Sequence, residues 1–301
     1  CAPLEIEGGK SLRGIRYRSP VASAQVKSCV LLAGLHASGT TEVIEPGRSR
    51  DHTERMLPVF GVEMPAGACV TGGSRLAAAG FEVPADPSSA AFMMAAACLV
   101  PESHILLRDV GLNPTRTGFI EALEAMNADV RLTNRRRFGG EPVGDIEVRW
   151  RTGLGSVALG ARSIPAIIDE LPLLMAMAGL ADGVTQIRGA EELRVKESDR
   201  IAVMAAGMEA LGFGVRAYPD GIDIEGQPSG NSKPGANGRR VTVDAMGDHR
   251  CAMSFCVLAQ ALDRPVRILG CAEIATSYPG FVDDLRLLGG QVQYQGESVN
   301  A

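Results

Sequence analysis

Asp169 to Leu180, with the sequence DELPLLMAMAGL, is a helix-forming run of small and apolar residues. Each of three other segments shares this character and is followed by a β-like run, a polar loop and a second helical stretch. These segments are Ser23 to Leu35 (SAQVKSCVLLAGL), Ser88 to Val100 (SSAAFMMAAACLV) and Asp248 to Leu262 (DHRCAMSFCVLAQAL). The repetition predicts an α/β protein built from copies of one supersecondary unit.

The second helical stretches also end alike. Their last residues are FGVEM (Phe60 to Met64), MNADV (Met126 to Val130), LGFGV (Leu211 to Val215) and LGGQV (Leu288 to Val292). The first helices start 65, 81 and 79 residues apart, which is too long a period for a helical solenoid. We therefore interpret each copy as a βαβαββ module packed around a pseudo-symmetry axis.

The segment Val83 to Pro87 (VPADP) separates the first copy from the rest, because its prolines favour an extended connector. We expect a first domain over residues 1–84, with one copy, and a second domain over residues 85–301, with three. The imbalance indicates an incomplete first domain and an N-terminally truncated chain. Two polar stretches, Asn134 to Glu141 and Gly226 to Arg240, are expected to be hairpin tips or connectors, and the three arginines from Arg135 to Arg137 are assigned to a solvated turn.

The composition excludes several classes of protein. The formal net charge is -5, which argues against a surface built for nucleic acid or an anionic membrane. The longest apolar run, Ala90 to Val100, is too short to cross a bilayer, and no signal segment opens the chain. The cysteines lack a CxxC motif and the histidines are scattered, so neither a disulfide framework nor a metal site is predicted. We expect a cytoplasmic monomer.

Polar residues gather where the helices are expected to begin. Helix N-termini carry unpaired N–H groups and a partial positive charge, so serine and arginine there suit phosphate and carboxylate ligands. These positions are Ser23-Ala24-Gln25, Ser88-Ser89, Asp169-Glu170 and Asp248-His249-Arg250, with Arg48-Ser49-Arg50, Asn113 to Arg116, Arg194 to Arg200 and Thr276 to Pro279 before the second helices. Their coincidence predicts a site for a small polyanion. Helix capping is the alternative for each single position, and Asp51 with Glu54 has the form of a capping box.

Two of these positions are candidates for chemistry. If a helix starts at Ser198, then Lys196, Glu197 and Arg200 can face one pocket. Asp169 lies at a helix start behind an apolar run, where a carboxylate next to a substrate hydroxyl can act as a general base. A solvated ion-pair turn and an ordinary cap are the alternatives.

Several longer segments resemble one known family. They are PVASAQVKS (Pro20 to Ser28), SRDHTERML (Ser49 to Leu57), NPTRTG (Asn113 to Gly118), IIDELPLL (Ile167 to Leu174), EELRVKESDRI (Glu191 to Ile201) and GDHRCAMSF (Gly247 to Phe255). The set is similar to the 3-phosphoshikimate 1-carboxyvinyltransferases, also called 5-enolpyruvylshikimate-3-phosphate synthases, and it runs through the chain in family order.

The resemblance implies a fold and a reaction. The fold is the two-domain enolpyruvyl transferase fold, an inside-out α/β prism with three βαβαββ units in each domain. The enzyme closes around shikimate 3-phosphate and phosphoenolpyruvate, with no metal or organic cofactor. It transfers the enolpyruvyl group to the 5-hydroxyl of shikimate 3-phosphate and releases phosphate, on the pathway to chorismate and the aromatic amino acids, and it is the target of glyphosate.

The resemblance also implies roles for single residues. Asp169 would accept the proton of the attacking hydroxyl and Glu197 would assist proton transfer. Arg200 and Arg250 would bind phosphoenolpyruvate. The residues implied for shikimate 3-phosphate are Ser23, Ala24, Gln25, Ser49, Arg50 and Lys196.

The sequence departs from the family pattern in two ways. An early lysine, a Gly-Asn-Ala-Gly-Thr segment and an early arginine, which bind the substrates in the family, have no counterpart here, so we expect little or no activity from this chain alone. Thr276 also stands where some members have a lysine. Two rival functions stay open, the transfer of the same group to UDP-N-acetylglucosamine and a non-catalytic binding module of the same fold. RNA cyclases share the architecture but are a remote alternative, given the acidic charge balance.

Overall fold

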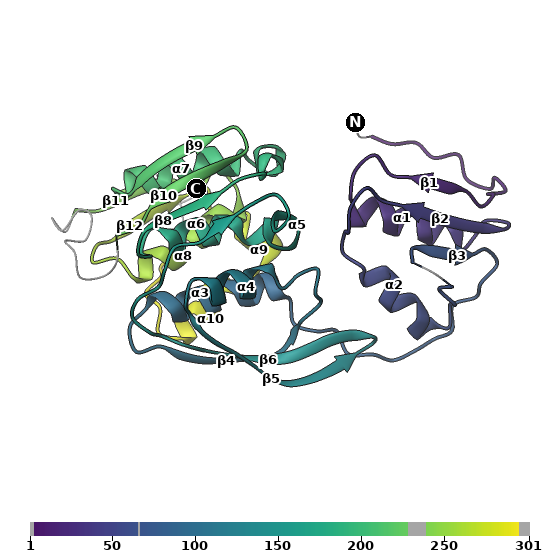
Figure 1. Cartoon of the computed structure of the whole chain (residues 1–301), viewed down its shortest axis with the longest axis horizontal. Coiled ribbons are helices and arrows are strands. Elements are labelled where there is room, and N and C mark those ends of the chain that lie inside the picture. Colours follow the sequence, from purple (N-terminus) through teal and green to yellow (C-terminus); the bar gives the residue numbers. More distant parts are fainter. Residues whose placement is uncertain (1–2, 66, 228–238, 295–301) are drawn as a thin grey trace, which may run out of the picture. The chain divides into compact units, whose positions relative to one another are not determined.

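The computed structural model describes residues 3–65, 67–227 and 239–294 of the 301-residue chain. The chain forms two compact units (Figure 1). Unit 1 consists of Cys1–Pro84 and Arg136–Val143, and unit 2 consists of Ala85–Arg135 and Gly144–Ala301.

Unit 1 contains one copy of the repeat. Its elements are β1 (Arg16–Arg18), α1 (Ala24–Gly34), β2 (Thr40–Ile44), α2 (His52–Met56), η1 (Leu57–Phe60) and β3 (Cys69–Thr71). β1 pairs with β2 in parallel, and β3 pairs with the other edge of β2 in antiparallel orientation. Helix α1 packs on this sheet through Leu31, which is fully buried with Leu57 and Val70 nearby in one apolar cluster. Helix α1 therefore covers one face of this sheet, and its first turn is capped by Ser23.

Residues 136–143 of unit 1 form the tip of a hairpin between β5 (Asp129–Phe138) and β6 (Glu141–Arg149). Gly140 has φ +83°, and a Cβ there would lie 2.7 Å from the carbonyl oxygen of Arg55, so only glycine fits this turn. His52 Nδ1 lies 2.7 Å from Glu141 Oε1 on the same side. The expected turn over Asn134 to Glu141 is thus shorter than predicted, because the arginines from Arg135 to Arg137 belong to β5.

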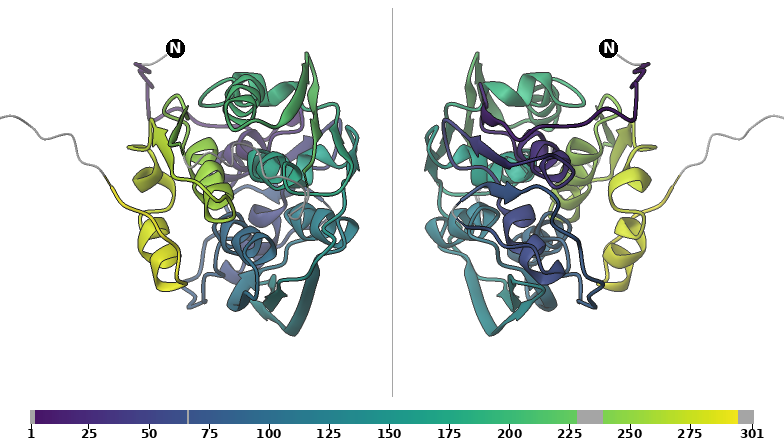
Figure 2. Two further views of the ribbon diagram at one scale, coloured as in Figure 1. Left: turned by 90° about the vertical axis from the view of Figure 1, so that its left-hand side faces the viewer. Right: turned by 90° about the vertical axis from the view of Figure 1, so that its right-hand side faces the viewer.

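Unit 2 contains the other copies. The second copy has α3 (Pro87–Leu99), β4 (His104–Gly111), α4 (Gly118–Ala125), β5 and β6, which run side by side as a hairpin in Figures 1 and 2. The third has β7 (Ala158–Leu159), α5 (Ile164–Ile167), η2 (Ile168–Glu170), α6 (Leu171–Ala178), β8 (Val184–Ile187), η3 (Glu191–Val195), α7 (Arg200–Ala210), β9 (Gly214–Tyr218) and β10 (Gly221–Glu225). The fourth has β11 (Val241–Asp244), α8 (His249–Gln260), β12 (Val266–Leu269), α9 (Ile274–Ser277) and α10 (Phe281–Leu287).

The copies share a strand pattern. The first strand of each copy pairs in parallel with the second: Ala85 bridges to Val110, β7 pairs with β8, and β11 pairs with β12. In the third copy β10 then joins β8 in antiparallel orientation and carries β9 on its far edge. Parallel strands need a helical crossover, whereas antiparallel strands need only a turn. This order of pairings is what a βαβαββ chain produces.

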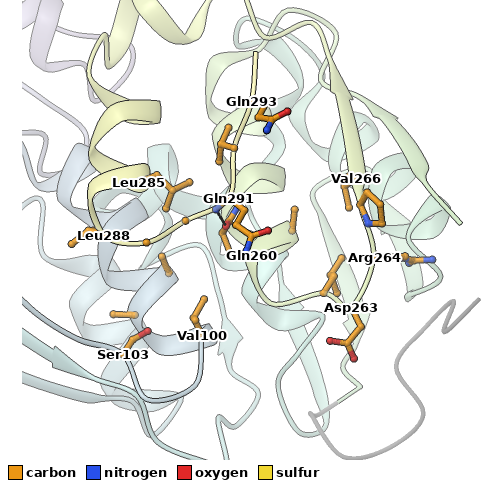
Figure 3. Close-up of a pocket in the computed structure, with 18 of the residues that line it drawn as sticks. Val100, Ser103, Gln260, Asp263, Arg264, Val266, Leu285, Leu288, Gln291 and Gln293 are labelled. Atoms are coloured by element: carbon orange, nitrogen blue, oxygen red, sulfur yellow. Dashed lines mark hydrogen bonds between the residues drawn. The ribbon is translucent and has the colours of Figure 1, made fainter. Parts of the chain in front are cut away.

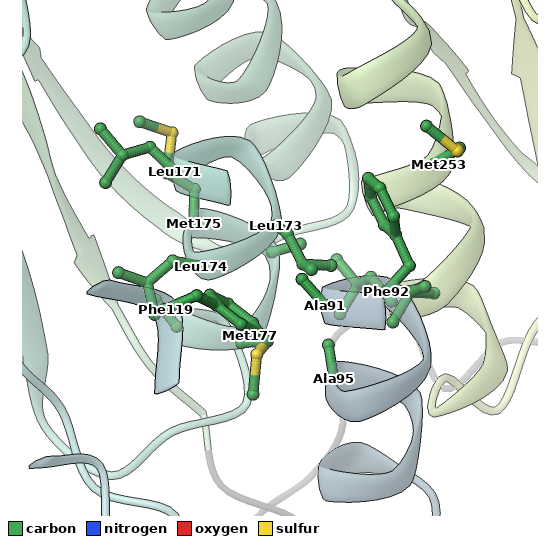
Figure 4. Close-up of a cluster of buried hydrophobic side chains, with 14 of the residues drawn as sticks. Ala91, Phe92, Ala95, Phe119, Leu171, Leu173, Leu174, Met175, Met177 and Met253 are labelled. Carbon is green, nitrogen blue, oxygen red and sulfur yellow. The ribbon is translucent and has the colours of Figure 1, made fainter. Parts of the chain in front are cut away.

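The core of unit 2 is built on the first helices of its copies. Helices α3, α6 and α8 pack against one another, and the sheets lie around them (Figure 1). Every residue of α6 is buried, as expected for a helix that is apolar all round. Figure 4 shows Ala91 of α3 beside Leu173 of α6, with Ala95 one turn further along, on the side of Met177. Alanine and glycine let these helices approach closely, and Gly207 of α7 faces the ring of Phe255 in α8.

Three predicted helix starts need correction. α7 begins at Arg200 rather than Ser198, because Asp199 caps it through a hydrogen bond from Ala202 N. α3 begins at Pro87 and is capped by Asp86 rather than by Ser88. The helix expected from Asp169 starts at Leu171, and Asp169 itself lies in the 3-10 turn η2. Most of the predicted loop Gly226 to Arg240 lies outside the described residues.

One further prediction on unit 1 is wrong. Asp51 precedes α2 but makes no capping hydrogen bond with its side chain. Its Oδ1 instead accepts a hydrogen bond from Arg55 Nε at 2.8 Å, because a guanidinium is a stronger donor than a backbone N–H. No helix in the described part of the chain combines the length and apolar character that a bilayer crossing needs.

Candidate active site

Arg200 is the centre of a polar cluster in unit 2. It is 1% exposed and is the first residue of α7, directly after the cap Asp199. Its Nε donates to Asp248 Oδ2 at 2.8 Å, and its Nη2 donates to Glu197. Nη1 is buried without a hydrogen-bond partner among the described residues and lies 4.0 Å from Asp169 Oδ1. A buried donor of this kind is costly unless a ligand uses it.

Asp248 connects Arg200 to the start of α8. It is fully buried, and its Oδ1 caps the helix by accepting hydrogen bonds from Arg250 N at 2.9 Å and Cys251 N at 3.2 Å. Its Oδ2 also accepts a hydrogen bond from Ser198 Oγ at 3.1 Å. Burial opposes the charge, but the Arg200 guanidinium and the helix N–H groups together hold the pKa of Asp248 below its ordinary value. Asp248 therefore fixes the start of α8 relative to Arg200 as an anion.

Arg250 points from the start of α8 toward η2. Its Nη1 lies 3.5 Å from the carbonyl oxygen of Asp169 and 3.8 Å from Glu170 Oε1. Asp169 thus lies near both guanidinium groups, through its carboxylate to Arg200 and through its backbone to Arg250. We call the set Asp169, Glu170, Glu197, Arg200, Asp248 and Arg250 the carboxylate–arginine cluster.

Glu170 is the buried carboxylate of this cluster, at 5% exposure. It accepts a hydrogen bond from the Ser88 hydroxyl at the start of α3. Arg116 Nη2 donates to the same hydroxyl at 2.6 Å and to Asp86 Oδ1 at 3.1 Å. Burial raises the pKa of Glu170, and the charge of Asp169 raises it further, while the Ser88 hydroxyl, Arg250 and Arg116 oppose the shift.

Glu197 and Lys196 lie on the loop before α7. The Glu197 side chain is half exposed and accepts a hydrogen bond from Arg200, so its carboxylate faces both Arg200 and solvent. Lys196 Nζ donates to Glu192 Oε1 at 2.6 Å, a residue outside the cluster. Of the three residues predicted to face one pocket, Glu197 and Arg200 therefore contact each other, whereas Lys196 pairs with Glu192 instead.

The remaining predicted residues lie in unit 1. Ser23 caps α1 by accepting a hydrogen bond from Val26 N at 3.4 Å, and Gln25 is exposed in the first turn. Ala24 is the first residue of the helix. Ser49 Oγ is buried without a hydrogen-bond partner among the described residues, next to Arg50 in the chain. Unit 1 therefore offers a helix N-terminus with a serine and, on a separate loop, an unsatisfied hydroxyl beside an arginine.

Unit 1 also holds a buried group that the sequence interpretation missed. Lys27 of α1 has a side chain only 4% exposed, with Nζ 3.0 Å from Glu45 Oε2 and 2.8 Å from Glu54 Oε1. Burial disfavours its charge, but the two carboxylates outweigh burial and raise the pKa of Lys27. Lys27 precedes Ser28, whose hydroxyl lies 2.6 Å from that of Thr53 in α2. These contacts fix α1 against α2, on both sides of the loop with Ser49 and Arg50.

Asp169, Glu197, Arg200 and Arg250 are thus brought together as predicted. Asp248 and Glu170 complete the cluster, although only their positions at helix starts marked them in the sequence. Thr276, in contrast, uses its hydroxyl within α9, where it donates to Glu273 O at 2.7 Å.

A cavity of about 1050 Å³ lies elsewhere in unit 2 (Figure 3). Its described lining includes Val100, Gln260, Arg264 and Leu285 and none of the cluster residues. Gln260 Oε1 accepts a hydrogen bond from Gln291 N at its wall. Within the described ranges, no group of histidine, cysteine, aspartate and glutamate side chains is arranged to hold a metal ion. The carboxylate–arginine cluster, with Arg200, Glu170 and Asp248 buried, is the candidate active site.

Comparisons with known proteins agree on one family. The family model described as EPSP synthase (3-phosphoshikimate 1-carboxyvinyltransferase) matches residues 1–285. A 3-phosphoshikimate 1-carboxyvinyltransferase of Methylococcus capsulatus is 50% identical over 96% of this chain and 64% of its own length. One of Halorhodospira halophila is 50% identical over 98% of this chain and 65% of its own length. The chain thus spans slightly less than two thirds of these relatives.

Solved structures give the same result. The EPSP synthase of Acinetobacter baumannii has a TM-score of 0.88 and 43% identity over 95% of this chain and 65% of that chain. The enolpyruvyl transferase NikO of Streptomyces tendae has a TM-score of 0.69 at 21% identity, over 87% of this chain and 58% of that chain, a likeness of fold alone. The predicted α/β class and enolpyruvyl transferase fold are confirmed.

Proposed function

The chain belongs to the EPSP synthase family, and from this we propose that the protein transfers the enolpyruvyl group of phosphoenolpyruvate to the 5-hydroxyl of shikimate 3-phosphate. The observation that carries the proposal is the buried Arg200, whose Nη1 has no hydrogen-bond partner among the described residues and lies beside Asp169. A cationic donor next to a carboxylate suits an anionic substrate that also needs a base. The proposal includes a cytoplasmic monomer and needs no metal or organic cofactor.

Arg200 and Arg250 are proposed to bind phosphoenolpyruvate. This substrate carries a carboxylate and a phosphate, and the planar guanidinium group can contact either through two N–H donors. Both side chains are largely buried, at 2% and 13% exposure, so their charges are weakly screened by water. Glu197 and Asp248 hold Arg200 from two sides, which lowers the entropy lost when a ligand binds.

Asp169 is proposed as the general base. In the addition step, its carboxylate takes the proton of the 5-hydroxyl while the hydroxyl oxygen bonds to the central carbon of phosphoenolpyruvate. The methylene carbon gains a proton in the same step, for which Glu197 is the proposed donor. In the elimination step, the C–O bond to phosphate breaks, the new methyl group returns a proton to the Glu197 carboxylate, and Asp169 gives its proton to the leaving phosphate, which leaves the enol ether. Positioned acid–base groups of this kind contribute about 10²–10⁴ in rate.

Unit 1 is proposed to hold the phosphate and ring of shikimate 3-phosphate through Ser23, Ala24 and Gln25. Ser49 and Arg50 add an unsatisfied hydroxyl and a guanidinium. The N-terminus of the 11-residue helix α1 supplies N–H donors and a partial positive charge. Lys196 is proposed to contact shikimate 3-phosphate after exchanging its ion pair with Glu192.

The test is release of phosphate in the presence of both substrates. It is run on the 301-residue chain and on that chain joined to the part of the Methylococcus capsulatus relative that it does not match. We expect Asp169→Ala to lower turnover of the joined protein by about 10²–10⁴-fold, with Asp283→Ala as a surface control. Unchanged turnover in Asp169→Ala would reject the base, and turnover with UDP-N-acetylglucosamine instead would favour the sister enzyme. Binding of both substrates without any turnover would favour a non-catalytic module.

A further inference from the structure

Glu170 is a buried carboxylate for which the reaction above has no use. It follows the proposed base directly in the chain and is 5% exposed. Burying a carboxylate costs several kcal/mol unless it is paired and hydrogen-bonded. The contacts of Glu170 therefore indicate what it does.

The first set of contacts fixes the carboxylate from the side of α3. Arg116 Nη2 donates to Ser88 Oγ at 2.6 Å, and a serine hydroxyl has one proton to give. That proton is donated to Glu170 Oε1. Arg116 is itself held by Asp86, the cap of α3. Glu170 Oε1 is thus an acceptor whose place is set from the start of α3.

The second set of contacts reaches Arg250. Glu170 Oε1 lies 3.8 Å from Arg250 Nη1, and the carbonyl oxygen of Asp169 lies 3.5 Å from the same nitrogen. The other end of Arg250 is also fixed, because its backbone N–H donates to Asp248 at 2.9 Å. The polar chain from Asp86 through Ser88 and Glu170 thus ends on the guanidinium group proposed to bind phosphoenolpyruvate.

We propose that Glu170 is a positioning residue, which orients the Arg250 guanidinium for phosphoenolpyruvate and is itself held by Ser88 and Arg116. The inference rests on the proposed function of Arg250. The carboxylate supplies a counter-charge on the inner side of the guanidinium, so that the outer N–H groups face the ligand. Without it, Arg250 keeps its charge but loses a fixed direction, and binding then costs the entropy of ordering the side chain.

The groups that face Glu170 also predict a pH signature. Asp169 and burial favour its protonated form, whereas Ser88, Arg116 and Arg250 favour the ionised form, and burial leaves the pKa raised. As the pH falls through this raised value, Glu170 takes up a proton and loses its hold on Arg250. The advantage of the wild-type protein over Glu170→Gln should therefore shrink at acid pH. If Glu170 acted through packing alone, independently of its charge, the two affinities would not approach each other as the pH falls.

The experiment is calorimetric titration of the 301-residue chain with phosphoenolpyruvate. Glu170→Gln keeps the size and a hydrogen-bonding oxygen but removes the charge, and we expect affinity to fall by about tenfold. Ser88→Ala should lower affinity in the same direction by a smaller factor, and it decides the matter if Glu170→Gln does not fold. Glu147→Gln, which breaks a surface ion pair with Arg149 on β6, is the matched control and should bind as the wild-type protein does.

The outcomes separate the two proposals. If the wild-type chain binds phosphoenolpyruvate and both Glu170→Gln and Ser88→Ala bind it equally well, the positioning role is rejected and the proposed function stands. If the wild-type chain does not bind phosphoenolpyruvate, the proposed site on Arg250 is rejected and this role with it. If Glu170→Gln weakens binding in an Arg250→Lys background as much as it does alone, Glu170 does not act through Arg250.

Discussion

Arg200 and Asp248 form an ion pair that is buried on both sides, with Nε 2.8 Å from Oδ2 and side-chain exposures of 2% and 0%. The two residues lie 48 positions apart, one at the start of α7 and the other at the cap of α8. The pair therefore joins two helix N-termini inside unit 2, and its removal should affect both stability and binding.

Replacing Asp248 with alanine should destabilise the protein by about 3–5 kcal/mol, because it removes the fully buried carboxylate paired with Arg200 and also removes a helix cap. The measurement is the free energy of unfolding in urea. Asp283→Ala, at an ion pair whose carboxylate is 84% exposed, should change this quantity by less than about 0.5 kcal/mol. Equal losses in the two variants would contradict the assignment of Asp248.

The pKa of Asp248 also predicts a dependence of stability on pH. Its folded-state pKa lies below the ordinary value of 3.8, so its contribution is complete above that value and is lost as the pH falls through the lower folded-state pKa. Compared with Asp248→Asn, the wild-type protein should thus lose extra stability below pH 3.8 and show no such difference in slope at neutral pH. Parallel acid titrations of the two proteins, followed by circular dichroism, measure this.

Replacing Arg200 with lysine should weaken phosphoenolpyruvate binding by about tenfold or more. Lysine keeps the charge. However, its single ammonium group lacks the separate, fixed N–H donors with which a guanidinium group can contact Asp248, Glu197 and a ligand at the same time. Titration with phosphoenolpyruvate measures the loss, and Arg149→Lys on the surface of β6 is the control. An affinity equal to that of the wild-type protein would show that the guanidinium group is not required.

Lys27→Met tests the buried ion pairs of unit 1. The two carboxylates of Glu45 and Glu54 would lose their counter-charge, so we expect a loss of about 3–5 kcal/mol in the free energy of unfolding. Lys10→Met, at a pair with both side chains more than two thirds exposed, should have almost no effect. Since the pKa of Lys27 is raised above 10.5, its stabilising effect is complete below pH 10.5 and is lost only as the pH rises through the higher folded-state value.

Gly207→Ala tests the contact between α7 and α8. A Cβ at Gly207 would lie 2.1 Å from Cζ of Phe255, so the gain in helix propensity is exceeded by overpacking of about 1–3 kcal/mol. Gly160 has nothing within 4 Å of its Cβ position, and Gly160→Ala should be close to neutral. Thermal unfolding of both variants provides the comparison, and a stabilised Gly207→Ala would show that the two helices can separate at little cost.

The sequence allowed the repeat and the long helices to be predicted, because their signals are local. The run Ser23 to Leu35 corresponds to α1 with both of its caps. Gly61, Gly212 and Gly289, all with positive φ, mark the ends of η1, α7 and α10, whereas Asn127 takes this place after α4. The family assignment is confirmed by the comparisons. Helix starts were less predictable, since aspartate and serine at neighbouring positions compete to cap the same helix, as Asp86 and Ser88 do.

The site was predictable only in part. Asp169, Glu197, Arg200 and Arg250 do gather, but their roles remain predictions. Glu170 and Asp248 appeared as ordinary helix-start residues because their partners are remote: Ser88 lies 82 positions from Glu170, and Arg200 lies 48 positions from Asp248. Lys27 appeared as one charge in an apolar helix, and only the folded unit brings to it Glu45, which follows β2, and Glu54 of α2.

The side-by-side packing of α3, α6 and α8 has a consequence for how such a site can diversify. Ser88, Glu170 and Arg250 lie at the starts of the first helices of consecutive copies, yet they are a hydroxyl, a carboxylate and a guanidinium group that contact one another in series. Internal duplication thus supplies the same location several times over, and each copy is free to specialise. A change of one side chain in each copy is therefore enough to turn a repeated backbone into a site whose groups differ in chemistry.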